Sequence, residues 1–174
     1  ESNRVELLNN LNFISPYIEL PKKLTVRQNL EVYGRLYDVK NLKEKIEYLS
    51  EKLRLDQIIN KITGELSSGQ KNRVGLAKSI INDPIILLLD EPTASLDPET
   101  GDFIRSFLED YQKERETSIL LASHNMSEVE RLCSSVFMMN NGSIIDQGSP
   151  EKLINKHGRK NMEEVFLKLA REKI

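Results

Sequence analysis

Two short runs of apolar residues restrict the fold of this chain more than any other feature. Residues 85–89 are five apolar residues in a row, and residues 118–122 contain four in a row after Ser118, so neither segment alternates between apolar and polar side chains. Such runs are typical of strands buried on both faces of a parallel sheet. Between them, Asp97-Pro98 predicts a helix start, with aspartate as the N-cap and proline in the first turn. Strand, helix and strand in this order predict a βαβ unit and therefore an α/β fold.

The first half of the chain predicts one short strand and a small helical layer. Weak apolar patterning allows a strand near residues 11–14. Thr25 and Gln28 have the spacing of a capping box, which predicts a helix start. Residues 42–53 carry apolar side chains on one helical stripe, and residues 70–82 predict a further amphipathic helix.

The last third of the chain predicts a hairpin between short helices. Ser127 and Glu130 again have capping-box spacing. Asn141-Gly142 lies between two apolar runs, which is a strong signal for a β-hairpin. Ser149 then begins another helix, which Gly158 ends before a final helical stripe.

Composition excludes several classes of protein. The 174 residues carry a net charge of only −2, so we expect no nucleic-acid binding through bulk positive charge. Cys133 is the only cysteine, which excludes an internal disulfide framework and a cysteine-cluster metal site. The longest apolar run, residues 85–89, is far shorter than a membrane span.

Polar side chains follow both predicted strands. Asp90 and Glu91 come directly after the first strand, and His124 follows the second. Because ligands bind at the carboxyl edge of such sheets, we expect the three side chains to converge there. Asp90 is a candidate Mg²⁺ ligand, Glu91 a candidate base for an attacking water, and His124 a candidate phosphate contact. The alternative is two solvated loop acids and a surface histidine.

A second candidate site precedes the helix predicted over residues 70–82. The serine hydroxyls of Ser67 and Ser68 and the free backbone amides of a helix N-terminus form an anion site. Gly69 allows the backbone to approach a phosphate closely. The alternative is a helix that is merely well capped.

Taken together, these segments resemble the ATP-binding subunit of ABC transporters from about Phe13 to Leu153. Leu66-Ser67-Ser68-Gly69-Gln70 resembles the signature motif, residues 85–90 the Walker B strand, and Ser95-Leu96-Asp97 the D-loop. Glu91 is similar to the catalytic glutamate and His124 to the switch histidine of that family. The implied fold is a partial P-loop NTPase sheet with a helical subdomain.

The resemblance implies ATP and Mg²⁺ as cofactors and a second ATPase domain as partner. Two such domains pair head to tail around two ATP molecules. The signature residues of one domain would face the γ-phosphate of ATP held by the other; these are Ser67, Ser68, Gly69 and Gln70. Asp90 would hold Mg²⁺, Glu91 would polarise the water, and Asp97 would help to communicate across the dimer. The helical layer would pass the motion to a transmembrane subunit, which places the protein in the cytoplasm at the inner face of the membrane.

Three departures from the family pattern limit what carries over. Ser68 stands where the family usually has glycine. Pro16 stands near the position of the Q-loop glutamine, and proline has no side-chain amide to contact Mg²⁺ or water. None of the eight glycines belongs to a Gly-x-x-x-x-Gly-Lys-Ser/Thr phosphate loop. We therefore expect an N-terminally incomplete ATPase that is weakly active or inactive alone.

The resemblance also implies a division of the chain into four parts. They are a core remnant with a degenerate Q-loop (1–23), a helical subdomain (24–64), the C-terminal part of the ATPase core (65–157) and a helical tail (158–174). Two alternatives remain open. One is a non-catalytic remnant that donates its signature motif to an intact ATPase, and the other is an ABC-type ATPase with a function other than transport.

Overall fold

The computed structural model describes residues 2–15 and 19–171 and divides the chain into two compact units, the second beginning at Ser123. The elements of the first unit are α1 (Ser2–Asn9), β1 (Leu11–Ile14), α2 (Val26–Leu36), α3 (Leu42–Lys52), the 3-10 turn η1 (Thr63–Glu65), α4 (Ser68–Ser79), β2 (Ile86–Asp90), α5 (Pro98–Arg115) and β3 (Ser118–Ala122). Those of the second unit are α6 (Met126–Leu132), β4 (Val136–Asn140), β5 (Ser143–Gly148), α7 (Pro150–His157) and α8 (Met162–Arg171). Within the described ranges, no helix combines the length and apolar character needed to cross a membrane.

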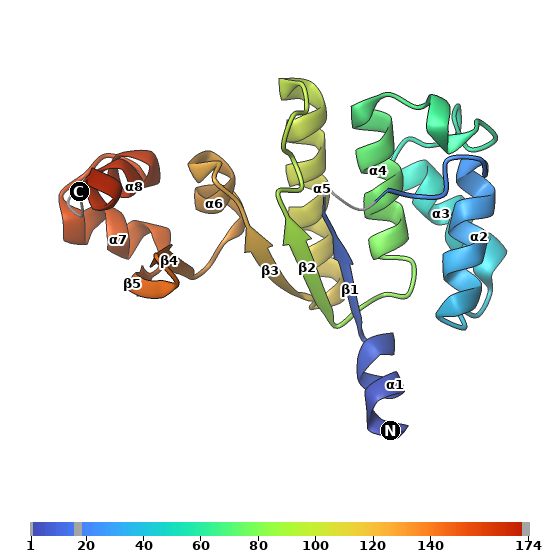
Figure 1. Ribbon diagram of the computed structural model, residues 1–174, viewed down its shortest axis with the longest axis horizontal. Coiled ribbons are helices and arrows are strands. Elements are labelled where there is room, and N and C mark those ends of the chain that lie inside the picture. Colours follow the sequence, from blue (N-terminus) through green and yellow to red (C-terminus); the bar gives the residue numbers. More distant parts are fainter. Residues whose placement is uncertain (1, 16–18, 172–174) are drawn as a thin grey trace. The chain divides into compact units, whose positions relative to one another are not determined.

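The first unit is built on a parallel sheet of three strands in the order β1-β2-β3 (Figure 1). The register pairs Leu11 with Ile86 and Ile86 with Ser118, so the three strands begin level with one another. Because α5 connects the parallel strands β2 and β3, the predicted βαβ unit is confirmed.

One face of this sheet is covered by helices and the other is partly open. Leu87 and Leu89 point to the same face of β2 and are buried. Helix α5 lies behind β2 in Figure 1. Phe13, Leu88 and Leu120 lie side by side on the opposite face, and Leu120 is 62% exposed. The prediction that the run at 85–89 is buried on both faces is therefore wrong, because the helices described here cover only one side of β2.

The helical layer forms as its capping signals predict. Thr25 Oγ1 accepts a hydrogen bond from Gln28 N (3.1 Å), and Gln28 Oε1 accepts one from Thr25 N (2.9 Å), which confirms the capping box of α2. Gly34 allows α2 and α3 to approach closely, because a Cβ atom there would lie 2.1 Å from Leu42 Cδ1. The layer is thus fixed by local caps and one tight helix contact.

Helix α1 was not predicted. Its Leu7 and Leu8 are adjacent rather than three or four residues apart, and both are exposed, so they do not mark an amphipathic helix. The short strand expected near residues 11–14 is confirmed as β1.

The second unit combines the antiparallel hairpin of β4 and β5 with the helices α6, α7 and α8. The predicted hairpin is confirmed: Asn141 and Gly142 have φ angles of 48° and 74°, as a tight turn with two left-handed residues requires. Its core is a small cluster of buried side chains from β4, α7 and α8, namely Met138, Leu153, Met162 and Val165. The boundary between the units falls inside the predicted segment 65–157.

The start of α6 differs from its prediction. Asn125, not Ser127, is the N-cap, and its side chain accepts a hydrogen bond from Glu128 N. Ser127 lies inside the helix and donates to Asn125 Oδ1 (2.7 Å). The predicted box fails because Glu130 instead accepts a hydrogen bond from Met162 N at the start of α8.

Candidate functional site

The carboxyl end of β2 holds Asp90 and Glu91 in a constrained turn. Asp90 is the last residue of the strand and accepts a hydrogen bond at Oδ2 from Ser15 Oγ (3.0 Å). Glu91 has φ 49°, a left-handed conformation that costs a non-glycine residue about 1–2 kcal/mol. Its N–H donates to Ala122 O (2.8 Å), and its carbonyl accepts from Ala94 N (3.1 Å). The turn thus fixes the backbone position of Glu91 and therefore the origin of its carboxylate. Strained backbone positions of this kind are common at functional sites.

Ser15 was not predicted to contribute to this site. It follows β1 directly, so the parallel pairing of β1 with β2 brings it level with Asp90. Pro16, which stands at the expected Q-loop position, lies outside the described residues. Among the described residues next to that position, Ser15 contacts Asp90 through its hydroxyl.

The oxygens at this edge fit a magnesium ion. Mg²⁺ usually takes one or two protein carboxylates and fills its remaining positions with water and substrate phosphate oxygens. Asp90 offers Oδ1 while Ser15 engages Oδ2. Among the described residues, no group of three or more histidine, cysteine or acidic side chains is arranged for a metal. A site here would therefore depend on water and phosphate for most of its ligands.

The N-terminus of α4 carries the predicted signature residues and forms a capping box. Ser67 Oγ accepts a hydrogen bond from Gln70 N (3.3 Å), and Gln70 Oε1 accepts one from Ser67 N (3.0 Å). The side chains of Ser67 and Gln70 therefore cap and stabilise the first turn of α4. Ser68 and Gly69 follow in the first turn, where backbone N–H groups have no preceding carbonyl to bond. Their amides, at the positive end of the helix dipole, are suited to an anion.

Asn72 and Gly69 place this helix against the segment that follows β2. Asn72 Nδ2 donates to Pro92 O (2.7 Å), directly after the Asp90-Glu91 turn. A Cβ atom on Gly69 would lie 3.4 Å from Thr100 Cγ2 in α5. Asn72 was not singled out in the sequence, yet it joins the two predicted sites through one hydrogen bond.

Arg73 connects α4 to the helical layer. Its Nη1 atom donates to the carbonyl oxygens of Leu53 (3.3 Å) and Arg54 (2.9 Å), which follow α3. Burial lowers the pKa of Arg73. This arginine was not identified as a functional residue from the sequence. The Arg73 side chain therefore joins α4 to the backbone that follows α3.

Asp97 is the N-cap of α5, as predicted. Its Oδ1 accepts a hydrogen bond from Thr100 N (2.9 Å), and this bond lowers the pKa of the Asp97 carboxyl. One oxygen of the carboxylate is thus engaged within its own helix turn. Its role across a dimer stays a prediction.

His124 belongs to the second unit. Its side chain is exposed and lies in a turn where Ser123 Oγ donates to Glu128 Oε2 (2.6 Å) and accepts from Asn125 N (3.0 Å). The structure brings Asp90 and Glu91 together at one sheet edge, whereas the convergence of His124 with them stays a prediction.

Comparisons with known proteins agree on one family. Its profile, described as ABC transporter, matches residues 2–94. The ABC transporter ATP-binding protein NatA of Bacillus subtilis (strain 168) is 36% identical over 152 residues, covering 86% of this chain and 61% of NatA. The Nod factor export ATP-binding protein I of Rhizobium sp. (strain N33) is 36% identical over 159 residues, covering 90% of this chain and 52% of that protein. The chain thus spans about half to three-fifths of the length of these relatives.

Solved structures support the same fold. One described as the ATP-binding subunit of an ABC transporter has a TM-score of 0.85 at 20% identity, covering 97% of this chain and 72% of its own. At that identity the likeness concerns the fold alone. The cbiO1 protein of Clostridium perfringens, described as part of the ABC transporter complex cbiONQ, has a TM-score of 0.76 at 28% identity, covering 98% of this chain and 68% of its own.

Proposed function

This chain belongs to the ABC transporter family of ATP-binding domains, and from that premise we propose that it is part of an ATPase subunit that couples ATP hydrolysis to membrane transport. The names of two relatives, an ABC transporter ATP-binding protein and an export ATP-binding protein, support this proposal. The proposed cofactors are ATP and Mg²⁺.

The observation that carries the proposal is the turn at the end of β2. Asp90 would hold Mg²⁺ through Oδ1 or a bound water, while the Ser15 hydroxyl keeps the carboxylate in one orientation. When bound, Mg²⁺ would neutralise charge that develops on the transferred phosphoryl group. The left-handed backbone of Glu91 fixes the origin of a carboxylate that would orient and deprotonate the attacking water.

The start of α4 would supply the other half of a nucleotide site. The Ser68 and Gly69 amides and the Ser68 hydroxyl would bind the γ-phosphate of ATP held by a second ATPase domain. Ser67 and Gln70 would act indirectly, because their side chains hold the helix start on which those amides depend. The Asn72–Pro92 hydrogen bond would link this half-site to the Asp90-Glu91 turn.

Two partners follow from the proposed function. One is a second ATPase domain, identical or different, that completes each nucleotide site. The other is a transmembrane transport subunit, which would hold the protein at the cytoplasmic face of the membrane. Arg73, which connects α4 to the residues after α3, would pass the movement of α4 to the helical layer.

The Glu91→Gln variant tests this assignment in the protein as its gene encodes it. We expect ATP binding to be retained and steady-state ATP turnover to fall by about 100-fold or more, because the base is lost while its shape remains. Glu99→Gln is a matched control, since it makes the same change at an exposed residue in the first turn of α5. Unchanged turnover in Glu91→Gln, or loss of ATP binding, would contradict the assigned role.

Affinity purification from membranes solubilised in mild detergent tests the proposed partner. We expect an integral membrane protein to copurify in a stoichiometric amount. Copurification with ribosomes or DNA instead would favour an ABC-type ATPase with a function other than transport.

A further inference from the structure

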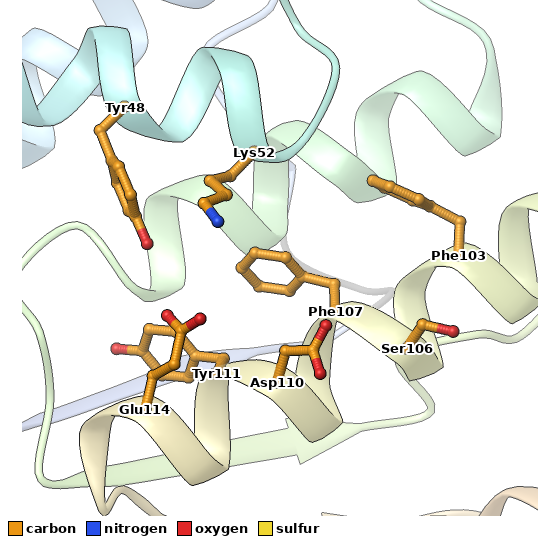
Figure 2. A pocket seen from close by; sticks show the side chains of 8 residues that line it. All are labelled: Tyr48, Lys52, Phe103, Ser106, Phe107, Asp110, Tyr111 and Glu114. Atoms are coloured by element: carbon orange, nitrogen blue, oxygen red, sulfur yellow. The ribbon is translucent and has the colours of Figure 1, made fainter.

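A cavity of about 180 Å³ lies between α3 and α5, away from the residues assigned to the nucleotide (Figure 2). Tyr48 and Lys52 reach into it from α3, one helical turn apart. Phe107 and Tyr111 form an aromatic stripe on α5, and Asp110 and Glu114 form an acidic stripe beside it. Each pair on α5 is spaced by four residues, so both stripes face the same side of the helix.

The walls of the cavity are aromatic. The rings of Phe107 and Tyr111 stack with their centroids 5.9 Å apart and an interplanar angle of 21°. Tyr111 is buried, and burial raises the pKa of its phenol to about 12. The faces of such rings carry negative electrostatic potential and attract cations.

The protein already places cations against the ring of Tyr48. The Lys45 ammonium lies 5.6 Å from the centroid of that ring, and the Lys52 ammonium lies 5.8 Å from it. Lys45 is held by Asp83, with Nζ and Oδ1 2.6 Å apart. Lys52 is exposed and has no ion-pair partner among the described residues. It is therefore free to leave the ring.

The charge of the lining favours a cation. Asp110 and Glu114 stand on the wall opposite Lys52 in Figure 2. The other cations beside Tyr48 are Lys45 and Arg115, and both lie against Asp83. The two carboxylates therefore face the Lys52 ammonium. Both acids are exposed, and neither has an ion-pair partner within the described ranges. A second positive group would balance the two carboxylates of the lining.

We propose that this cavity binds an organic cation, an ammonium or guanidinium group that displaces Lys52 from the Tyr48 ring and pairs with Asp110 and Glu114. The group contacts the faces of Tyr48 and Phe107, with its charge toward the two carboxylates. A free quaternary ammonium compound and a basic side chain of another protein share this chemistry. The site does not depend on the proposed ATPase function.

Binding of choline and of its neutral isostere 3,3-dimethylbutan-1-ol tests the chemistry. Both probes have the same shape, so a difference reports charge alone. We expect choline to shift amide resonances of α3 and α5 in two-dimensional NMR spectra, with a dissociation constant below about 10 mM, and the neutral isostere to bind at least about fivefold more weakly. Equal binding of the two probes, or no binding of choline at this concentration, overturns the proposal.

Variants that remove one charge each test whether the cavity attracts positive charge. Asp110→Asn and Glu114→Gln should each weaken choline binding about threefold or more, whereas Lys52→Gln should strengthen it by removing the competing ammonium. Glu99→Gln is the control of equal charge change on α5 outside the cavity. Weaker choline binding in Lys52→Gln would refute the proposed displacement. Because Lys52 is exposed, this variant should fold, so it can test the proposal even if another variant unfolds.

A short peptide, acetyl-Gly-Arg-Gly-amide, separates the two sources of the cation. Tighter binding of the peptide than of choline indicates a basic side chain of a protein partner. Tighter binding of choline indicates a free quaternary ammonium compound. Failure of both probes to compete with each other would contradict a single shared site.

Discussion

Replacement of Ser67 by alanine should destabilise the protein without removing a group that binds phosphate directly. The variant loses the hydrogen bond from Gln70 N to Ser67 Oγ, which is long at 3.3 Å and exposed. Loss of an N-cap serine costs about 1 kcal/mol, within a range of about 0.5–2 kcal/mol. For a chain of this size, about 1 kcal/mol lowers the melting temperature by about 2–4 °C.

Ser68→Ala is the matched control, because Ser68 is exposed and lies in the first helical turn rather than at the cap. We expect its stability to stay within about 0.5 kcal/mol of the parent, as for other exposed substitutions. The assay is urea unfolding followed by circular dichroism at constant pH. Equal stability of the Ser67→Ala variant and the parent, or a larger loss in Ser68→Ala, would refute the division of roles between the two serines.

Two further predictions concern a carboxylate and an amide. Lys156 and His157 lower the pKa of Asp146 from 3.8 to about 2, so its stabilising effect is present above about pH 4 and is lost as the pH falls toward 2. Allowing for screening by solvent, Asp146→Asn should lower the free energy of unfolding by about 1 kcal/mol at pH 7 and by much less near pH 2. An equal decrease at the two pH values would contradict this prediction. Asn72→Ala should cost about 1 kcal/mol in urea unfolding by removing the bond to Pro92 O, and an unchanged midpoint would contradict it.

The elements that could be predicted are those encoded by local signals. Thr25 and Gln28 form the expected capping box because both partners lie within one helical turn. Asn141-Gly142 forms the expected hairpin because few residue pairs tolerate two left-handed positions in succession. In α6, by contrast, two polar side chains compete for the cap, and Asn125 takes it because Glu130 is engaged by α8.

The parts of the site that could not be predicted depend on contacts between distant residues. Ser15 and Asp90 are 75 residues apart in sequence, and Asn72 and Pro92 are 20 apart. No local pattern marks either contact, because each depends on how β1 and α4 pack against the end of β2. The motif residues themselves were visible, whereas the side chains that position them were not.

The most direct test of the proposed function is the oligomeric state of Glu91→Gln in the protein as its gene encodes it, measured by light scattering with and without Mg-ATP. We predict a dimer with Mg-ATP and a monomer without it, because the stalled site holds two domains together. Adding Gly69→Asp should abolish the dimer, since a carboxylate at the start of α4 would repel the γ-phosphate that these amides are proposed to bind. A monomer in both conditions, or a dimer that survives Gly69→Asp, would contradict the proposal that α4 completes the nucleotide site of a second domain.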